Sequence, residues 1–231
     1  MVKKLFQLFL VILLAKVLIS NQVSKSNHEI VCDNESVHTT ITGTKEVDIN
    51  YSKYETEVVA YFKEIALKSE FSDQVRSKPR RWSTDMKIYV DGYCPEYLLL
   101  ELHVIVKELN DLIDPIQIRL VANRADANYF IFLGSMYDFH KKYPTTDLQL
   151  LKKNLGFFQL YFSGKGEMYI DMVRTEGDEL AQMHLLREEL TQSLWLCNDS
   201  WKYPESIFYQ GWTTTTEYSE MDKTLISMLY N

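Results

Sequence analysis

The side chains best suited to chemistry gather in one stretch of the last third of the chain. Glu188 and Gln192 are four residues apart, so a helix places them one turn apart on the same side. His184 precedes Glu188 by four residues and extends this side by another turn. Two interpretations of the His184–Glu188 pair stay open. It is either an ordinary contact between helix neighbours, or a carboxylate and an imidazole that hold a metal ion.

A helix must position these residues, and the surrounding pattern predicts one at residues 187–196 that ends near residues 197–199. Apolar residues recur at helical spacing along one side and indicate a buried stripe: Met183, Leu186, Leu190, Leu194 and Cys197. The other side carries Leu185, Trp195 and Leu196 beside the polar residues. A simple surface helix is polar there. We therefore expect this helix to be covered on both sides, with its polar groups facing a cleft.

Other catalytic patterns are missing from the sequence. It has 8 glycines, none of them clustered as in a phosphate-binding loop, and no G-x-S-x-G elbow. The cysteines Cys32, Cys94 and Cys197 include no C-x-x-C pair, which excludes a zinc site built on thiolates. Cys94 and Cys197 are either buried free thiols or, in an exported chain, partners in a disulfide.

Composition narrows the class of partner. The formal net charge is −7, which argues against nucleic acid, because phosphate-backbone binding needs clustered Lys and Arg. Hydrophobic residues make up 46% of the chain and aromatic residues 13%, which is sufficient for a packed core. We therefore expect a folded protein that does not bind nucleic acid, and a peptide or protein partner stays open.

The N-terminus has the pattern of an export signal. Two lysines precede a short apolar run at residues 5–15, and small or polar residues follow from Ser20. Lys16 interrupts the run before it reaches the roughly 20 apolar residues of a membrane-spanning helix. We therefore expect residues 1–20 to be cleaved rather than retained as an anchor. The mature protein would then be periplasmic, in the cell envelope or secreted, without stable membrane insertion.

The remainder predicts one α+β domain at residues 49–231, preceded by a polar lead segment at residues 21–48 with a short strand near residues 37–42. Besides the helix above, the expected helices cover residues 51–69, 95–112 and 220–230, and the expected strands cover residues 86–90, 116–121, 125–133, 157–162 and 167–173. Residues 134–155 are expected to be a link. These elements predict a twisted mixed sheet of about five strands packed with an N-terminal, a central, an active-site-type and a C-terminal helix.

The final third resembles the C-terminal half of a metzincin-type metalloprotease. In that class the active helix carries H-E-x-x-H-x-x-G-x-x-H, and a Ser-Ile-Met turn follows. Here residues 188–198 read E-E-L-T-Q-S-L-W-L-C-N, residues 206–209 read S-I-F-Y, and the closing helix ends in Leu229-Tyr230. Within that class the chain most resembles the domain-of-unknown-function 2927 family, which has Glu-Glu-x-Thr-Gln in place of His-Glu-x-x-His. The resemblance covers most of residues 61–230 and implies a zincin-like fold.

The resemblance also implies roles for individual residues. Glu189 stands at the position of the general base. The three zinc histidines correspond to Glu188, Gln192 and Asn198, which are therefore the implied metal ligands. Trp195 stands where the class has a glycine, and Phe208 where it has the turn methionine. Carboxylate and amide oxygens are harder ligands than imidazole and suit magnesium, calcium or manganese better than zinc.

Three functions are then alternatives. The favoured one is a non-catalytic binding or interaction protein, because without a metal nothing lowers the pKa of the water beside Glu189. The second is a metal-dependent hydrolase with Glu189 as base and a divalent metal held by Glu188 and Gln192, together with Asn198, Asp199 or His184. The third is a two-carboxylate glycosidase, but adjacent residues on a helix point about 100° apart, which is poor for flanking one bond. Structurally, the same polar residues could simply hydrogen-bond loop backbone across the cleft.

Overall fold

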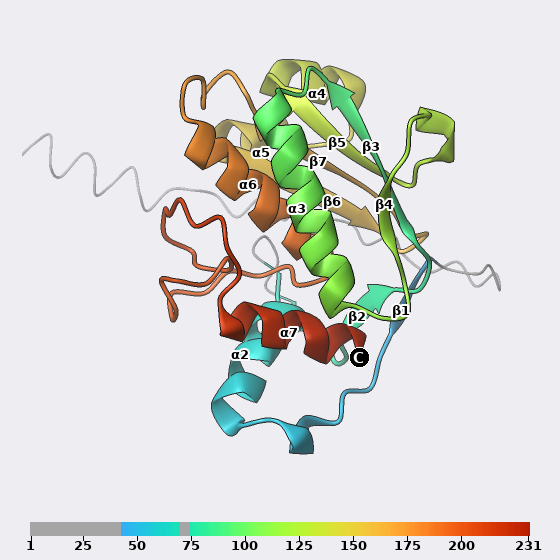
Figure 1. The fold of residues 1–231 in the computed structure, drawn as a ribbon, viewed down its shortest axis with the longest axis vertical. Coiled ribbons are helices and arrows are strands. Elements are labelled where there is room, and N and C mark those ends of the chain that lie inside the picture. Colours follow the sequence, from blue (N-terminus) through green and yellow to red (C-terminus); the bar gives the residue numbers. More distant parts are fainter. Residues whose placement is uncertain (1–42, 70–73) are drawn as a thin grey trace, which may run out of the picture. The chain divides into compact units, whose positions relative to one another are not determined.

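Five strands form one mixed sheet with an antiparallel edge. In the computed structural model their order is β4-β3-β5-β7-β6 (Figure 1). Their bounds are Met86–Gly92 for β3, Ile118–Leu120 for β4, Tyr129–Gly134 for β5, Gly156–Tyr161 for β6 and Lys165–Asp171 for β7. β3 pairs in parallel with β4 and β5, and β5 pairs in parallel with β7. The hairpin from β6 to β7 makes β6 the antiparallel edge strand.

The structure describes residues 43–69 and 74–231. Its six α-helices are α2 (Thr56–Leu67), α3 (Glu96–Leu112), α4 (Met136–Lys142), α5 (Leu148–Lys153), α6 (Glu179–Gln192) and α7 (Glu220–Tyr230). There are also two short 3-10 helices, η1 (Tyr51–Lys53) and η2 (Arg124–Asp126). A small antiparallel pair joins β1 (Thr44–Glu46) to β2 (Arg80–Trp82). Within these ranges no helix combines the length and apolar character needed to cross a bilayer. The expected export signal and the strand expected near residues 37–42 lie outside the described residues.

Alternate residues of the central strands pack on opposite faces of the sheet. Ile131 of β5 belongs to the main core, with residues of α3 and α6, whereas its neighbour Phe132 belongs to a second cluster with residues of α4 and α5. In β7, Met168 and Tyr169 divide in the same way. Figure 1 shows α3 and α6 on the near side of the sheet, with α4 and α5 beyond it. Since side chains of a strand alternate between faces, burial on both faces explains the nearly continuous apolar runs.

A buried arginine holds α6 against α3. The Arg187 side chain is 1% exposed, and its guanidinium bonds Glu101 Oε1 at 2.8 Å and also pairs with Glu108. The guanidinium carbon also lies 4.6 Å from the ring centre of Tyr218. Because a buried charge needs such partners, these contacts determine where α6 lies along α3.

The α+β class and the mixed five-stranded sheet are confirmed. The stretch expected as a link at residues 134–155 instead contains α4 and α5, so that expectation was wrong. Each of these short helices has a capping residue, Ser135 or Asp147, whose side chain accepts a backbone N–H. Each buries a single residue, Phe139 or Leu151, and so shows no apolar stripe.

Helix α6, which carries Glu188 and Glu189, differs from the expected helix at both ends. It begins at Glu179, where Asp178 caps it, and it ends at Gln192 rather than near residues 197–199. The reason for the early end is Trp195, whose φ of 75° is left-handed and incompatible with a continuing helix. The expectation that both sides are covered is confirmed, because ten residues of α6 are buried, including polar ones.

The two cysteines of the described domain remain apart. Cys197 is buried after α6, and Cys94 is partly buried just before α3. Both are free thiols, so the disulfide alternative was wrong. Burial raises the pKa of both thiols, which disfavours the reactive thiolate.

Candidate functional site

A cavity of about 310 Å³ opens beside the polar side of α6. Its lining comes from the α5–β6 connection and the start of β6 (residues 153–158), from α6 (His184, Leu185, Glu188, Glu189 and Gln192), and from the segment after α6 (Asp199 and residues 209–212). The cleft expected from the sequence is therefore present. Its volume lies near the lower limit for small-ligand sites, which run from about 300 to 1,000 Å³.

The imidazole ring of His184 is held by a backbone carbonyl of the segment after α6. Its Nδ1 lies 2.7 Å from the carbonyl oxygen of Thr215, which can only accept, so Nδ1 carries the hydrogen. Burial lowers the pKa of His184, although the bond to Thr215 opposes this shift. Its Nε2 lies 3.4 Å from Glu188 Oε2 and 3.5 Å from the Thr213 hydroxyl. The helix contact between His184 and Glu188 expected from the spacing is therefore formed.

Glu189 lies against the backbone of the edge strand. Its side chain is almost fully buried, and a Cβ built on Gly156 would fall 2.3 Å from Glu189 Oε1. Only a residue without a side chain leaves room for this carboxylate at the start of β6. Sequence reasoning missed Gly156, although a glycine beside an apolar strand is a known mark of close approach.

Gln192 and Asp199 are joined across the turn that follows α6. The side-chain amide of Gln192 donates to Asp199 Oδ1. Burial raises the pKa of Asp199 to about 6, and the bond from Gln192 opposes this shift. Asn198 is not among the cavity-lining residues, and its Nδ2 instead donates to the backbone carbonyl of Asp199 at 2.6 Å. The structure thus brings Glu188, Glu189 and Gln192 together but leaves Asn198 outside.

These donors do not fit a zinc ion. Across residues 43–69 and 74–231, no group of three or more His, Cys, Asp and Glu side chains is arranged to hold a metal. Gln192 uses its amide as a donor toward Asp199, and Asn198 lies apart from the cavity. Zinc sites in hydrolases need three converging ligands and an open position for water.

The sequence of the domain that carries this cavity matches a known family. The sequence model of the family described as "Protein of unknown function (DUF2927)" matches residues 55–231. The chain belongs to this family. The match spans α2 to α7 and therefore includes every residue that lines the cavity. A search among curated proteins finds no match.

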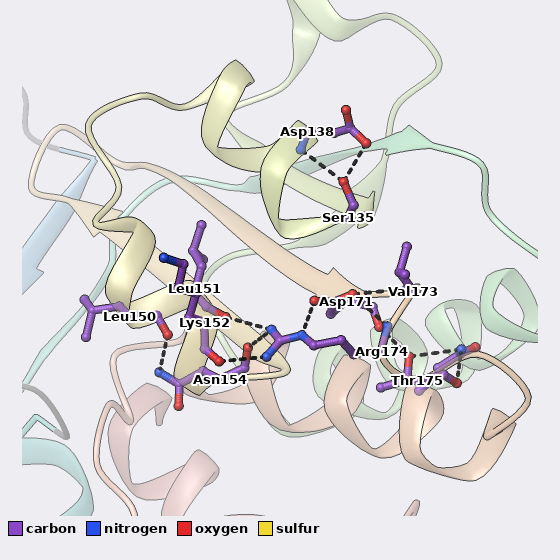
Figure 2. A network of polar contacts seen from close by, with 11 residues as sticks. Ser135, Asp138, Leu150, Leu151, Lys152, Asn154, Asp171, Val173, Arg174 and Thr175 are labelled. Atoms are coloured by element: carbon purple, nitrogen blue, oxygen red, sulfur yellow. Dashed lines mark hydrogen bonds and ion pairs between the residues drawn. The ribbon is translucent and has the colours of Figure 1, made fainter. Parts of the chain in front are cut away.

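One wall of the cavity in this DUF2927 domain is held by Arg174, shown in Figure 2. Its guanidinium donates to the backbone carbonyls of Leu151 at 2.7 Å, Lys152 at 2.9 Å and Asn154. It also pairs with Asp171, the last residue of β7. Burial raises the pKa of Asp171, but bonds from Tyr169 and Arg174 outweigh it and leave that pKa below its usual value. No sequence pattern indicated this role, because the partners are backbone groups about 20 residues away.

The Ser-Ile-Phe-Tyr turn anchors another part of the cavity lining. Ser206 Oγ donates to Asp222 Oδ1 at 2.5 Å, and the backbone N–H of Ile207 donates to Asp222 Oδ2 at 3.1 Å. Asp222 is fully buried and forms a capping box with Ser219 at the start of α7. The motif therefore anchors the turn that leads into the wall at residues 209–212.

Proposed function

We propose that this DUF2927 protein is a non-catalytic binding protein that takes an extended polypeptide segment into the cavity between α6 and β6. The observation that carries the proposal is the state of the metal-ligand positions. Gln192 donates its amide to Asp199, and Asn198 lies outside the cavity, while the cavity itself remains open. A hydrolase without converging metal ligands would lose its main means of activating water.

The edge strand supports a polypeptide as the ligand. β6 ends the sheet, and one side of it pairs with β7. Its first three residues line the cavity. An extended segment can add to such an edge through main-chain hydrogen bonds, while pockets beside the edge receive its side chains. A segment on β6 would therefore pass over the polar side of α6.

A zincin-like fold is part of this proposal. Its support is the order of the elements: a mixed sheet ending in an antiparallel edge hairpin, then α6 with Glu189, the turn at residues 206–209, and α7. An exported location, inferred from the signal pattern of residues 1–20, is the second part, and the partner would then be an envelope or extracellular polypeptide.

Selection of random peptides tests the binding function. A phage-displayed library of random dodecapeptides would be selected against the immobilised full chain. We expect a recurrent set of sequences that compete with one another and lose binding when Gly156, in the cavity wall, is replaced by Trp. The matched control is Lys223→Gln on the surface of α7, which should retain binding. Absence of any recurrent set would contradict the proposal.

Metal analysis separates this function from the hydrolase. Protein purified from medium supplemented with zinc, manganese and magnesium should carry well under one metal ion per chain. One ion per chain, lost on Glu188→Ala, together with peptide cleavage lost on Glu189→Gln, would establish the hydrolase instead.

A further inference from the structure

We propose that the cavity receives a lysine or arginine side chain of the bound polypeptide, at the place where the metzincin resemblance implies a metal ion. This inference rests on the proposed function and names the chemical class of the group that the cavity accepts. Three features carry it: the charge of the lining, its aromatic wall, and the way in which the chain holds an arginine of its own.

The charge of the lining favours a cation. Glu188, Glu189 and Asp199 all line the cavity, whereas Lys153 is the one lysine or arginine among the lining residues that the structure describes. Hydrogen bonds between carboxylates and ammonium or guanidinium groups are roughly twice as strong as neutral ones.

The aromatic wall is a second and independent feature. Besides Phe157, whose ring packs in the second core cluster, three aromatic residues line the same cavity: Phe158 from β6, and Tyr209 and Trp212 from the segment after α6. Trp212 is largely exposed, so its ring is available at the rim. Cations are attracted to the faces of such rings, most strongly to tryptophan. A small cavity that combines carboxylates with aromatic rings therefore suits an organic cation with an apolar stem.

The chain uses the same combination internally. The guanidinium of Arg187 is held by two carboxylates, Glu101 and Glu108, and lies over the ring of Tyr218. That arrangement keeps an arginine side chain almost fully buried. The cavity provides the same chemical groups, carboxylates and aromatic rings, and no lysine or arginine of α6 is among the lining residues that the structure describes.

Donor geometry distinguishes an organic cation from a metal. A divalent metal needs several oxygen ligands that converge at about 2.0–2.6 Å on one point, and the described residues include no such group of acidic, histidine or cysteine side chains. A lysine ammonium has three N–H donors and an arginine guanidinium has five. Because these donors point in several directions, one such cation can hydrogen-bond more than one carboxylate at ordinary distances of about 2.7–2.9 Å.

Matched peptides test the inference. From the dodecapeptides selected as above, the tightest binder would be synthesised with its basic residue intact or replaced by norleucine, which keeps the stem and removes the charge. Calorimetry would measure the affinity of both peptides for the unmodified chain, for Glu188→Gln, for Glu189→Gln and for Glu220→Gln, an exposed control on α7. We expect norleucine to weaken binding at least about tenfold. Either cavity variant should reduce that preference, and Glu220→Gln should leave it unchanged.

The outcomes separate the two proposals. Selected sequences without a basic residue, or equal affinity for the norleucine peptide, would overturn the inference and leave the binding function standing. A basic preference that survives in both cavity variants would also overturn it, because the cation would then bind elsewhere. Absence of any selected peptide would overturn both. Thermal melting of each variant shows that a changed affinity comes from a folded protein.

Discussion

Replacement of Trp195 provides the sharpest test of the turn that ends α6. Its side chain is 1% exposed and stacks on Phe162, with ring centres 5.7 Å apart and planes 6° apart. Arg76 and Arg80 lie over the same indole. Yet its φ of 75° is a conformation that glycine adopts freely and other residues do not. The packing of the Trp195 side chain therefore stabilises the fold, while its left-handed backbone destabilises it. The relative size of these two effects decides how much stability a substitution costs.

Truncation to alanine removes the packing but keeps the backbone strain. Loss of a buried tryptophan side chain costs about 3–5 kcal/mol. Glycine loses the same packing but regains about 1–2 kcal/mol, because the left-handed conformation no longer opposes a Cβ. We therefore expect Trp195→Ala to lower the free energy of unfolding by about 3–5 kcal/mol and Trp195→Gly by about 1–4 kcal/mol. Packing outweighs strain in both variants.

Urea unfolding followed by circular dichroism measures these differences, and melting should show a fall of roughly 2–4 °C per kcal/mol for a domain of this size. Trp195→Phe is a useful control. Among the described residues the indole Nε1 has no hydrogen-bond partner, so phenylalanine removes a buried unpaired donor and should cost less than alanine. If the glycine variant matched the unmodified protein, the packing argument would be wrong. If alanine were as stable as glycine, the left-handed backbone would be refuted.

Three further predictions concern the cavity and the helix that forms it. Arg187→Met should lower the free energy of unfolding by about 3–5 kcal/mol, because it leaves carboxylates of α3 without their buried cation. Glu108→Gln should lower it by less than about 1 kcal/mol, because the Glu108 side chain is 41% exposed. Asp199 holds its proton more tightly in the folded protein, since folding raises its pKa from 3.8 to about 6. The free energy of unfolding should therefore fall by up to about 3 kcal/mol as pH rises from about 4 to 6, and curves of that free energy against pH for the unmodified protein and Asp199→Asn measure the difference. Gly156→Ala should weaken peptide binding about tenfold, because the new methyl displaces the Glu189 carboxylate.

Each of these predictions has a result that would count against it. Equal costs for Arg187→Met and Glu108→Gln would show that the guanidinium is not a buried clamp. Parallel stability curves for Asp199→Asn and the unmodified protein would show that Asp199 has its ordinary pKa. Unchanged peptide affinity in Gly156→Ala would show that the position of the Glu189 carboxylate does not matter for binding.

Much of the fold could be predicted from local patterns. The closing helix α7 has the bounds expected from the sequence, and the β6–β7 hairpin lies where two apolar runs flank a glycine-containing turn. These elements depend on neighbouring residues, which the sequence displays directly. The short helices α4 and α5 were missed because each buries only one residue and so has no detectable period.

The sequence by itself determined the family and the helix that carries the site, because motif spacing on one helix specifies which side chains share a side. It placed Glu188, Glu189 and Gln192 together, and the structure has all three in the cavity lining. Only the tertiary structure decided what surrounds them. Gly156 meets Glu189 because the edge strand lies beside α6, and Asn198 lies outside the cavity lining, where its amide bonds the backbone of Asp199. Contacts between segments distant in the chain depend on sheet order and on where each helix ends, and no local pattern contains that information.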